Sequence, residues 1–566
     1  MPDKTERREF ETVLVMLLVG VLATCLSVGC GDDMAMAGDE GADAMNEAES
    51  APVGDDDDGF EDGDDDDSFE PEEEEFVVEQ VASTESYVFV PNRSDGSDTV
   101  ALIDGRDFSV RPIQVGLEPE HVQAADVGDQ GAVAYVLSRG EPTVSIIRAD
   151  AGEAPTVDIL SVPSEVNALT VAPDGRHLLA YIDPDEPIDA GDGAASLQTL
   201  ALVSLGPESG QDEVFELSVS PYIEDITFSD NGDQAFVVGE QGVHRLWLGD
   251  IKADMVVPPL GLEIDGIDMS AADREFAVAA DGQTLAVRNG TDSGLGLFSL
   301  DGDDAEVEQE RFVELDGVPT DLDLVEGEDS LQVVAPVRSQ SQVVTFDVDE
   351  AMGGGDESSF LEIIDATGAD AGIGRWTPDQ TAMAVFSTVP EIPRVGLVDI
   401  ATGEIDIVEF RNQIRNLEIS PDSKTAVAVH RRQEGPAPTN TPEDQFRHSE
   451  GLTLWDLDTG FLRPVTLHGE PEQISMVTDD DGRAFLYVML TPTDEPGADA
   501  QGLMRVNLAT HATSFYSLPR LPTRLGAVAG KVFVSQKQDS GRITFFDIVT
   551  SNQHTVSGYE LNAGIE

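Results

Sequence analysis

The sequence predicts an all-β protein made of about ten repeated units, each with four short antiparallel strands. Two observations support this prediction. From about Phe76 onwards, runs rich in β-branched residues are separated by turn residues, and no long helical period is present. The same strand–turn–strand pattern also returns about every 50 residues, which is the length of a repeat unit in ring-shaped β folds.

The repeat is most regular at Leu417–Gly460. Pro421 presets the φ angle of a turn, Asp422 can accept a hydrogen bond from its own backbone, and Gly460 supplies a positive φ. We therefore use the turn between the first two strands of each unit as the register mark. An early turn is expected near Thr84–Ser86, and the others near Asp129, Asp174, Asn231, Asp281, Glu328, Asp379, Asp422, Asp481 and Gly530.

Each unit continues with a third strand that commonly ends at an acidic residue, followed by a fourth strand. Four strands in about 50 residues is typical of the blade of a β-propeller. Two third-strand segments, Val144–Asp150 and Leu200–Leu205, depart from the pattern, and Phe76–Val81 is expected to complete a terminal blade as its inner strand. The acidic ends are seen at Val100–Asp104, Val344–Asp347, Gly396–Asp399, Leu454–Asp456 and Thr544–Asp547, and fourth strands at Arg111–Val115 and Ile405–Val408.

These units resemble bacterial YVTN-type and WD-repeat-like propellers. That family has a strand, a Pro-Asp-Gly turn, a second strand, a strand ending in Val-Asp, and a Gly-x-x-Pro connection. The connection is seen here at Gly116–Pro119, in shorter form at Gly469–Pro471, and more loosely at Gly317–Pro319. The resemblance covers residues 76–566 and implies the propeller architecture. It implies little about function, because such propellers share little beyond shape.

The N-terminus predicts export. Thr12–Gly29 carries no charge, and polar residues resume directly after Cys30. This segment resembles the signal peptide of a bacterial lipoprotein, which is cleaved just before a cysteine that becomes lipidated. Residues 1–30 are therefore interpreted as a signal peptide ending at Cys30. The family prefers Leu where Ser27 stands, so Cys25 and an uncleaved anchor helix both remain alternatives.

Residues 31–75 predict a disordered acidic tether. The segment has no Lys or Arg and contains acidic runs at Asp55–Asp58, Asp64–Asp67 and Glu72–Glu75. Like charges at this density bury too little apolar surface to offset chain entropy. The propeller is assigned to residues 76–566. We expect it in the cell envelope, lipid-anchored on the periplasmic or outer face, with the outer membrane favoured.

Composition excludes some partners. The chain has 112 acidic and 31 basic residues, a formal net charge of −81, and no basic patch with interleaved aromatic residues. Such a surface repels nucleic acid, so no nucleic-acid partner is predicted. Scarce lysine in an acidic chain fits either adaptation to high salt or an ordinary acidic exported protein.

Motifs for chemistry are missing from the sequence. Both cysteines lie at the N-terminus, and the eight histidines form no His-x-x-x-His pair. There is no Gly-x-Ser-x-Gly elbow, Walker loop or dinucleotide fingerprint. No catalytic residue, metal site or cofactor is therefore predicted.

Propellers usually bind at the channel mouth, near the connections that enter the inner strand. On this basis we predict ligand-binding residues at Glu120, His121, Tyr222, Arg415 and Arg524. Basic groups are rare here, so Arg415 and Arg524 could hold an anionic ligand, or they could only neutralise nearby acids. Other residues expected at the mouth are Glu165, Glu224, Thr320 and Gln473.

Long connections between second and third strands should project from the same face. They are Asp183–Leu197, Val389–Arg394, Gln433–Glu450 and Thr491–Gln501. The third of these is locally basic and aromatic, so it is either an interaction surface or a disordered insertion. Its predicted interacting residues are Arg431, Arg432, Phe446, Arg447 and His448.

Taken together, the sequence favours a non-enzymatic, lipid-anchored propeller that binds a protein, peptide or glycan of the envelope. One alternative is a lactonase-like propeller enzyme acting on an anionic or sugar-derived substrate at the channel mouth, with His121 beside Arg415 or Arg524. A structural envelope component whose ring mediates assembly is a further alternative.

Overall fold

The protein is described by a computed structural model that places residues 82–559, apart from 94–95, 151, 185–196, 270, 272, 301–305, 328–329, 370, 390–392, 436, 480, 494–497 and 539. The predicted signal peptide, acidic tether and Phe76–Val81 strand lie outside these residues. Within the described part of the chain, no helix has the length and apolar character needed to cross a membrane.

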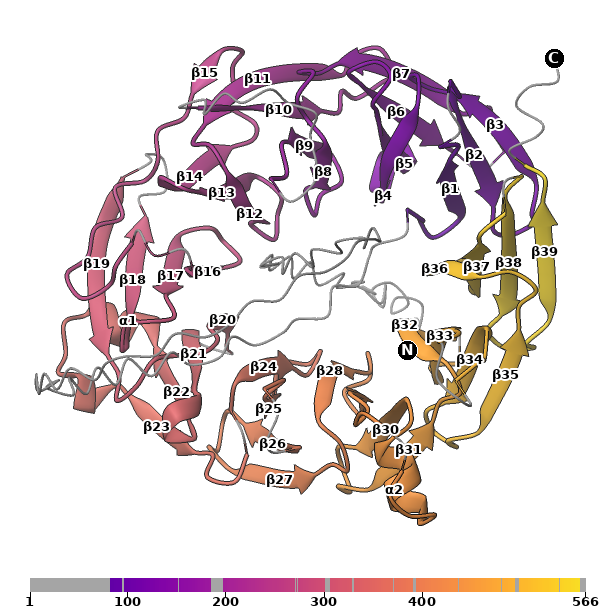
Figure 1. Cartoon of the computed structure of the whole chain (residues 1–566). Helices are drawn as coiled ribbons and strands as arrows, with labels where there is room; N and C mark the ends of the chain where they lie inside the picture. Colours follow the sequence, from indigo (N-terminus) through magenta and orange to yellow (C-terminus); the bar gives the residue numbers. More distant parts are fainter. Residues whose placement is uncertain are drawn as a thin grey trace, which may run out of the picture.

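Ten sheets are arranged as a closed ring, which confirms the all-β propeller with ten units (Figure 1). We number the sheets 1–10 in chain order. In most of them the chain runs outward from an inner strand to an outer strand, and each strand pairs antiparallel with the one before it. The third strands thus lie in the outer half of the ring.

The inner strands line the central opening (Figure 1). They are β4 (Pro119–Val127), β8 (Ala168–Val171), β12 (Ile223–Phe228), β16 (Glu275–Val278), β20 (Asp323–Glu326), β24 (Ile373–Trp376), β28 (Ile414–Ile419), β32 (Glu470–Thr478) and β36 (Pro522–Val528). The second strands are β1 (Tyr87–Pro91), β5 (Gly131–Ser138), β9 (His177–Tyr181), β13 (Gln234–Gly239), β17 (Thr284–Arg288), β21 (Leu331–Val337), β25 (Ala382–Phe386), β29 (Thr425–His430), β33 (Ala484–Thr491) and β37 (Lys531–Gln536).

The third strands are β2 (Thr99–Asp104), β6 (Thr143–Ala149), β10 (Gln198–Ser204), β14 (Gly242–Trp247), β18 (Gly294–Leu300), β22 (Gln342–Asp347), β26 (Arg394–Asp399), β30 (Gly451–Asp456), β34 (Gly502–Asn507) and β38 (Arg542–Asp547). The outer strands are β3 (Val110–Gln114), β7 (Thr156–Ser161), β11 (Glu213–Val219), β19 (Val307–Glu314), β23 (Glu362–Asp365), β27 (Ile405–Glu409), β31 (Leu462–Thr466), β35 (Thr513–Ser517) and β39 (Gln553–Ser557).

The turn pattern explains this regularity. The predicted first turns from Asp129 to Gly530 all fall between two strands of the structure, whereas the early turn at Thr84–Ser86 directly precedes β1. The residue with positive φ is glycine in the Asp174, Asn231 and Asp281 turns. The acidic ends of the third strands also have a physical role. Asp456 accepts hydrogen bonds from the backbone nitrogen of Thr459 at 2.8 Å and from its hydroxyl at 2.6 Å. The same arrangement recurs at Asp399, Asn507 and Asp547.

Three sheets depart from the expected four strands. In sheet 4 the chain leaves β14 and forms β15 (Met255–Val256), which pairs in parallel with the outer strand β11 of sheet 3. Pro258 and Pro259 follow directly and cannot donate backbone hydrogen bonds, which disfavours a regular fourth strand. Sheet 4 therefore has three strands and sheet 3 has five. Sheet 1 also has three among the described residues, in which its inner edge carries only the isolated bridge Ser83–Val88.

The core lies between neighbouring sheets, where aliphatic side chains from facing strands pack together. The ring closes in the same way between sheets 10 and 1. Val88 and Ile103 pack with Phe533 and Phe545, and Phe108 stacks on His554 with 4.0 Å between the ring centroids. Two short α-helices, α1 (Val348–Met352) and α2 (Pro442–Arg447), and three 3-10 turns, Gly128–Gln130, Arg338–Gln340 and Glu357–Ser359, complete the described elements.

Candidate functional site

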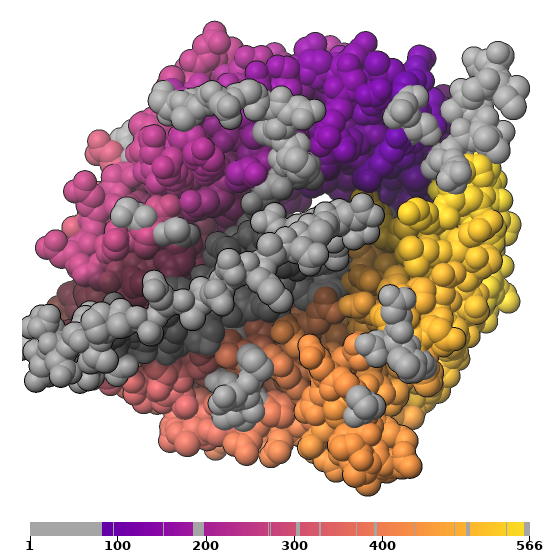
Figure 2. All heavy atoms as spheres, in the orientation of Figure 1, coloured from indigo at the N-terminus to yellow at the C-terminus, as the bar shows by residue number. Residues whose placement is uncertain are grey.

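The ring has two faces with different connections. The connections from second to third strands, and from each outer strand to the next inner strand, lie on one face, which we call the loop face. The turns between first and second strands, and between third and outer strands, lie on the other, which we call the turn face. Figure 2 shows the sheets as a thick rim around a central hollow. The strands that flank the four long connections predicted from the sequence place the ends of these connections on the loop face.

The five predicted ligand-binding residues lie on or directly before inner strands, and they belong to four different sheets. Glu120 and His121 belong to β4, Tyr222 directly precedes β12, Arg415 belongs to β28 and Arg524 to β36. These strands are distributed around the central opening (Figure 1). The fold therefore spreads the predicted residues over sheets 2, 4, 8 and 10, and places no two of those sheets next to each other.

Local contacts of these residues vary. Glu120 forms an ion pair with Arg139, and Arg415 lies 3.6 Å from the carboxylate of Glu470 on the next inner strand. Tyr222 has a positive φ of 54° and a 55% exposed side chain, so its ring faces solvent at the entry to β12. Positive φ is uncommon for a non-glycine residue. Of this set, Tyr222 is the residue with an exposed aromatic ring.

Three other residues predicted at the channel mouth instead join neighbouring inner strands. The Thr320 hydroxyl donates to the carbonyl of Gly372 at 2.8 Å, and the Gln473 side chain accepts from the backbone nitrogen of Leu525 at 2.8 Å. Glu224 lies 3.4 Å from Arg274. Glu165, in contrast, is exposed. Part of the predicted polar lining is thus used to hold the ring together.

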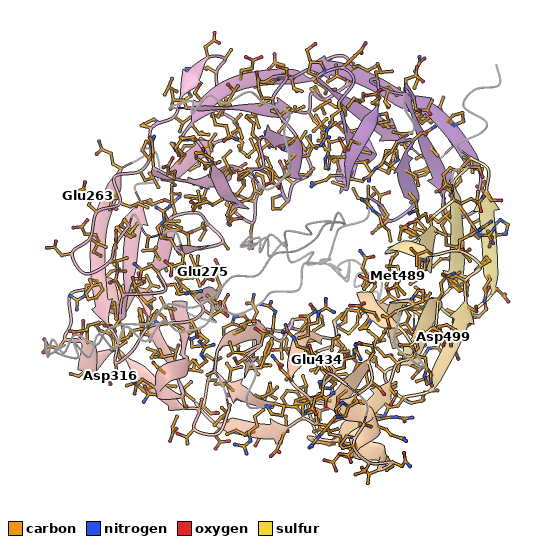
Figure 3. The ribbon with its side chains drawn as sticks, in the orientation of Figure 1. Glu263, Glu275, Asp316, Glu434, Met489 and Asp499 are labelled. Carbon is orange, nitrogen blue, oxygen red and sulfur yellow. The ribbon has the colours of Figure 1, made fainter. Side chains whose placement is uncertain are left out.

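The inner wall of sheets 4–6 is acidic and half-buried. Burial raises the pKa of Asp225, on β12, to about 6. Burial and nearby Asp321 and Asp323 raise the pKa of Glu275, on β16, although its ion pair with Arg288 opposes the shift. Figure 3 shows Glu275 at the inner edge of the ring. Within the residues that the structure places, no group of His, Cys, Asp and Glu is arranged to hold a metal ion.

The connection 433–450 contains helix α2. Thr441 caps the helix by accepting from the backbone nitrogen of Asp444 at 3.2 Å, and Pro442 occupies the first turn. Phe446 is buried and contacts His430 edge to face, with 5.6 Å between the ring centroids. The helix is therefore fixed to sheet 8 by an aromatic side chain, at the periphery of the ring (Figure 1). This favours an ordered surface over a disordered insertion.

The charged residues of this connection form ion pairs. Arg432 lies 3.1 Å from Glu450, and Arg447 lies 3.0 Å from Glu443 one helical turn away. His448 contacts the carbonyl of Gly435 through Nδ1 at 3.0 Å, and Arg431 is half-buried. The predicted interaction surface is thus close to charge-balanced, and Phe446 supports it from below.

Two buried histidines were not singled out from the sequence. In His244, Nε2 accepts from the backbone nitrogen and hydroxyl of Ser220, at 3.0 and 2.6 Å, while Nδ1 donates to the carbonyl of Val257 at 2.9 Å. The pair looks like a nucleophile and its base, but both side chains are 1% exposed. Burial lowers the pKa of His244, so it is a neutral structural group.

His430 has the same role in sheet 8. Its Nε2 contacts the hydroxyl of Thr453 at 2.7 Å, and burial lowers its pKa to about 4. A signal for both residues exists in the sequence. Each histidine belongs to a largely apolar, buried strand, where a polar side chain must find an internal partner.

Comparisons with known proteins identify similar folds only. The sequence matches no protein-family model and no curated protein. A eukaryotic initiation factor structure is 13% identical over 85% of this chain and 97% of its own length, with a TM-score of 0.47. Apo AztD from Citrobacter koseri is 13% identical, over 68% and 95%, with a TM-score of 0.33. A candidate 6-phosphogluconolactonase from Bacteroides uniformis is 14% identical, over 60% and 92%, with a TM-score of 0.32. These similarities do not bear on the ligand of this chain.

Proposed function

We propose that the protein is a lipid-anchored, extracytoplasmic β-propeller that binds a protein, peptide or glycan without chemical turnover. The observation that carries this proposal is the distribution of Glu120, Tyr222, Arg415 and Arg524 over non-neighbouring sheets. A macromolecule or extended chain can contact several sheets of an open ring at once. A small substrate needs convergent groups within a few ångströms of one reacting atom.

The loop face is the proposed binding surface. It carries the long connections, the exposed ring of Tyr222 and the helix-bearing connection 433–450. Loops held on a rigid scaffold are the usual location of binding residues. The anchor is proposed at Cys30, with residues 31–75 as a self-repelling spacer between the membrane and the ring.

Binding is tested with purified residues 31–566 immobilised and exposed to cell-envelope extract, followed by mass spectrometry and titration of the captured partner. We expect Arg415→Gln to weaken binding of that partner by about 5- to 30-fold, corresponding to roughly 1–2 kcal/mol. Arg463→Gln is the matched control, because Arg463 is exposed on the outer strand of the same sheet. Equal affinities for both variants would contradict the proposal.

The enzyme alternative has a separate readout. Purified protein is incubated with sugar lactones, and ring opening is followed by proton release at constant pH. Turnover that is lost in His121→Ala would replace the binding proposal with the lactonase-like alternative.

The anchor is tested by expressing full-length protein and fractionating membranes. Cys30→Ala should prevent labelling by a clickable fatty acid and release the protein from the outer-membrane fraction, whereas Cys25→Ala should retain both properties. Labelling that is lost only in Cys25→Ala would move the anchor to Cys25. Unlabelled but membrane-bound protein would favour the uncleaved helix.

A further inference from the structure

One position of the third strand fills the space between neighbouring sheets all around the ring. It is the residue of the third strand that pairs with the third or fourth residue of the second strand, as in the pairs Val133–Arg148, Phe236–Arg245 and Tyr487–Arg505. We call it the bridging position. In nine sheets it holds a large side chain: Leu102, Arg148, Leu202, Arg245, Leu297, Leu397, Leu454, Arg505 and Phe545.

The arginines at the bridging position show how a cationic side chain is held between neighbouring sheets. Arg505 lies over the ring of Phe485, with 4.1 Å from its guanidinium carbon to the centroid. It donates from Nη2 to the carbonyl of Ile548 in the next sheet at 2.6 Å, and from Nη1 to the hydroxyl of Ser551 at 2.8 Å. A guanidinium group therefore fits between two sheets near the turn face.

Arg245 combines an aromatic ring with a glutamine: its guanidinium carbon lies 4.7 Å from the centroid of the Trp247 ring. Its Nε donates to the side-chain oxygen of Gln234 at 2.7 Å, and its Nη2 donates to the carbonyl of Gly282 in the next sheet at 3.2 Å. Gln234 occupies the same register position in sheet 4 as Phe485 in sheet 9, two residues before the one opposite the bridging arginine. The environment thus repeats with different acceptors.

Sheet 6 has Thr345 at the bridging position, opposite Val334. A threonine is too short to reach the next sheet, and a cavity of about 280 Å³ lies there, between sheets 6 and 7. The hydroxyl of Thr345 is buried and has no hydrogen-bond partner among the placed residues, which is costly for a polar group. The volume is below the roughly 300–1,000 Å³ of sites for drug-sized ligands.

The lining of this cavity repeats the surroundings of the bridging arginines. Gln332 pairs with Asp347 and has the register position of Gln234. Ile400 follows the residue that ends β26, as Ile548 follows the residue that ends β38, and both donate their backbone nitrogen to a first-turn carbonyl. Glu362 lies opposite Thr345 on the outer strand.

The negative charge of the residues that line the cavity favours a cationic ligand. Asp347, Glu350 and Glu362 contribute three carboxylates, and no Lys or Arg is among the placed residues that line the cavity. Carboxylate, amide and carbonyl oxygens arranged around a narrow space match the five N–H donors of a planar guanidinium better than a compact ammonium. Asp347 also accepts from the backbone nitrogen of Glu350 at 2.9 Å, which holds its carboxylate in place at the start of α1.

We propose that this cavity binds the guanidinium group of a ligand that is not part of this chain. The group would occupy the place that Arg148, Arg245 and Arg505 fill in sheets 2, 4 and 9, with Gln332, Asp347 and Glu362 as acceptors. The site opens toward the turn face and is independent of the binding surface proposed on the loop face. The guanidinium could come from a free small molecule or from an arginine side chain of another protein.

The test is isothermal titration calorimetry of residues 31–566 at low salt. Agmatine probes the free small molecule, and an N-acetyl-Gly-Arg-Gly-amide peptide probes the side chain. The same peptide with citrulline is the neutral control of equal shape. We expect binding of at least one guanidinium probe and at least tenfold weaker binding of the citrulline peptide. Equal binding of arginine and citrulline peptides, or no binding of either guanidinium probe, would overturn the proposal.

Two substitutions separate the cavity from the general acidity of the surface. Thr345→Leu introduces the side chain found in five other sheets and leaves the charge unchanged, while Thr345→Arg supplies an internal guanidinium. Both should weaken binding at least tenfold without lowering the melting temperature. Glu362→Gln should weaken it, whereas Glu308→Gln, with an equal change of charge on the exposed outer strand of sheet 5, should not. Unchanged binding in both Thr345 variants would show that the acidic surface alone attracts the guanidinium probes, without the cavity.

Discussion

Arg148 donates from Nη2 to the Asp212 carboxylate at 2.5 Å and thereby joins the third strand of sheet 2 to sheet 3. The Asp212 side chain is fully buried. We predict that Arg148→Ala destabilises the protein by about 3–5 kcal/mol, because it leaves a buried carboxylate without its cation. The measurement is a shift of the urea unfolding midpoint at neutral pH.

The double variant Arg148→Ala/Asp212→Ala provides the control for this pair. Removing both charges should restore part of the loss, because the fully buried carboxylate of Asp212 is then no longer left without its cation. Arg148 also contacts Asp158 at 3.0 Å and Gln130 at 3.0 Å, so the recovery should be incomplete. If the double variant is as unstable as the sum of the single variants, the two side chains are not coupled.

The Asp456–Thr459 turn gives a second prediction. Asp456→Ala should cost about 1 kcal/mol, because the backbone nitrogen and hydroxyl of Thr459 lose their acceptor. Asp456→Asn should cost much less, since Asn507 makes the same contacts in sheet 9. Chemical denaturation of both variants measures the difference. Asp458→Ala, at an exposed neighbour, serves as the control, and an equal loss there would contradict the role of the turn.

The repeat itself could be predicted from the sequence because local chemistry repeats with it. Pro-Asp-Gly turns and Asp-x-x-Thr turns need particular residues at fixed places. The strands, the turn positions and the number of units could therefore be predicted from the sequence. The route from β14 to β15 could not be predicted, because it depends on a pairing with another sheet. Phe76–Val81 as an inner strand stays a prediction.

The sites were harder to predict, because a ring brings together residues that are far apart in sequence. The sequence hypothesis grouped His121 with Arg415 in one site. The order of the sheets in the ring, which places these residues on sheets 2 and 8, was needed to separate them. The cavity between sheets 6 and 7 did have a signal in the chain. Thr345 stands in the segment Val344–Asp347 where other units have Leu, Arg or Phe. This threonine can be interpreted only with the strand register, which shows that its position spans the gap between two sheets.

His430 predicts how stability depends on pH. Its pKa is about 4 in the folded protein, below the ordinary 6.5, so the folded state favours the neutral ring. The stability that depends on this neutral ring is fully present above pH 6.5 and is lost as pH falls from 6.5 toward 4. The full loss amounts to about 3 kcal/mol. Thermal unfolding measured between pH 4 and 7.5 should show this decline.

The variant His430→Gln tests the assignment. A glutamine can still contact Thr453 but does not titrate in this range, so its stability should decline less on acidification than that of the native protein. Burial also lowers the pKa of His244, which should keep part of the acid sensitivity in the variant. The same slope in both proteins between pH 6.5 and 4 would contradict the role of His430.

Phe446 predicts how the connection 433–450 is held. Its buried ring packs against His430, and removing such a side chain usually costs about 3–5 kcal/mol. Because the contact anchors one connection, Phe446→Ala should open that connection locally and leave the ring folded. Trypsin should then cleave after Arg431, Arg432 or Arg447 at least tenfold faster, since roughly 1.4 kcal/mol corresponds to a factor of ten.

Glu443→Gln is the control for this last prediction, because it removes only the exposed partner of Arg447. Such a pair contributes about 0.3–0.5 kcal/mol, so cleavage should change by no more than two- to threefold. If the connection forms part of the binding surface on the loop face, Phe446→Ala should also weaken binding of the captured partner while the melting temperature stays close to that of the native protein. Slow cleavage in Phe446→Ala would mean that other contacts hold the helix, and loss of the whole fold would mean that Phe446 supports the ring itself.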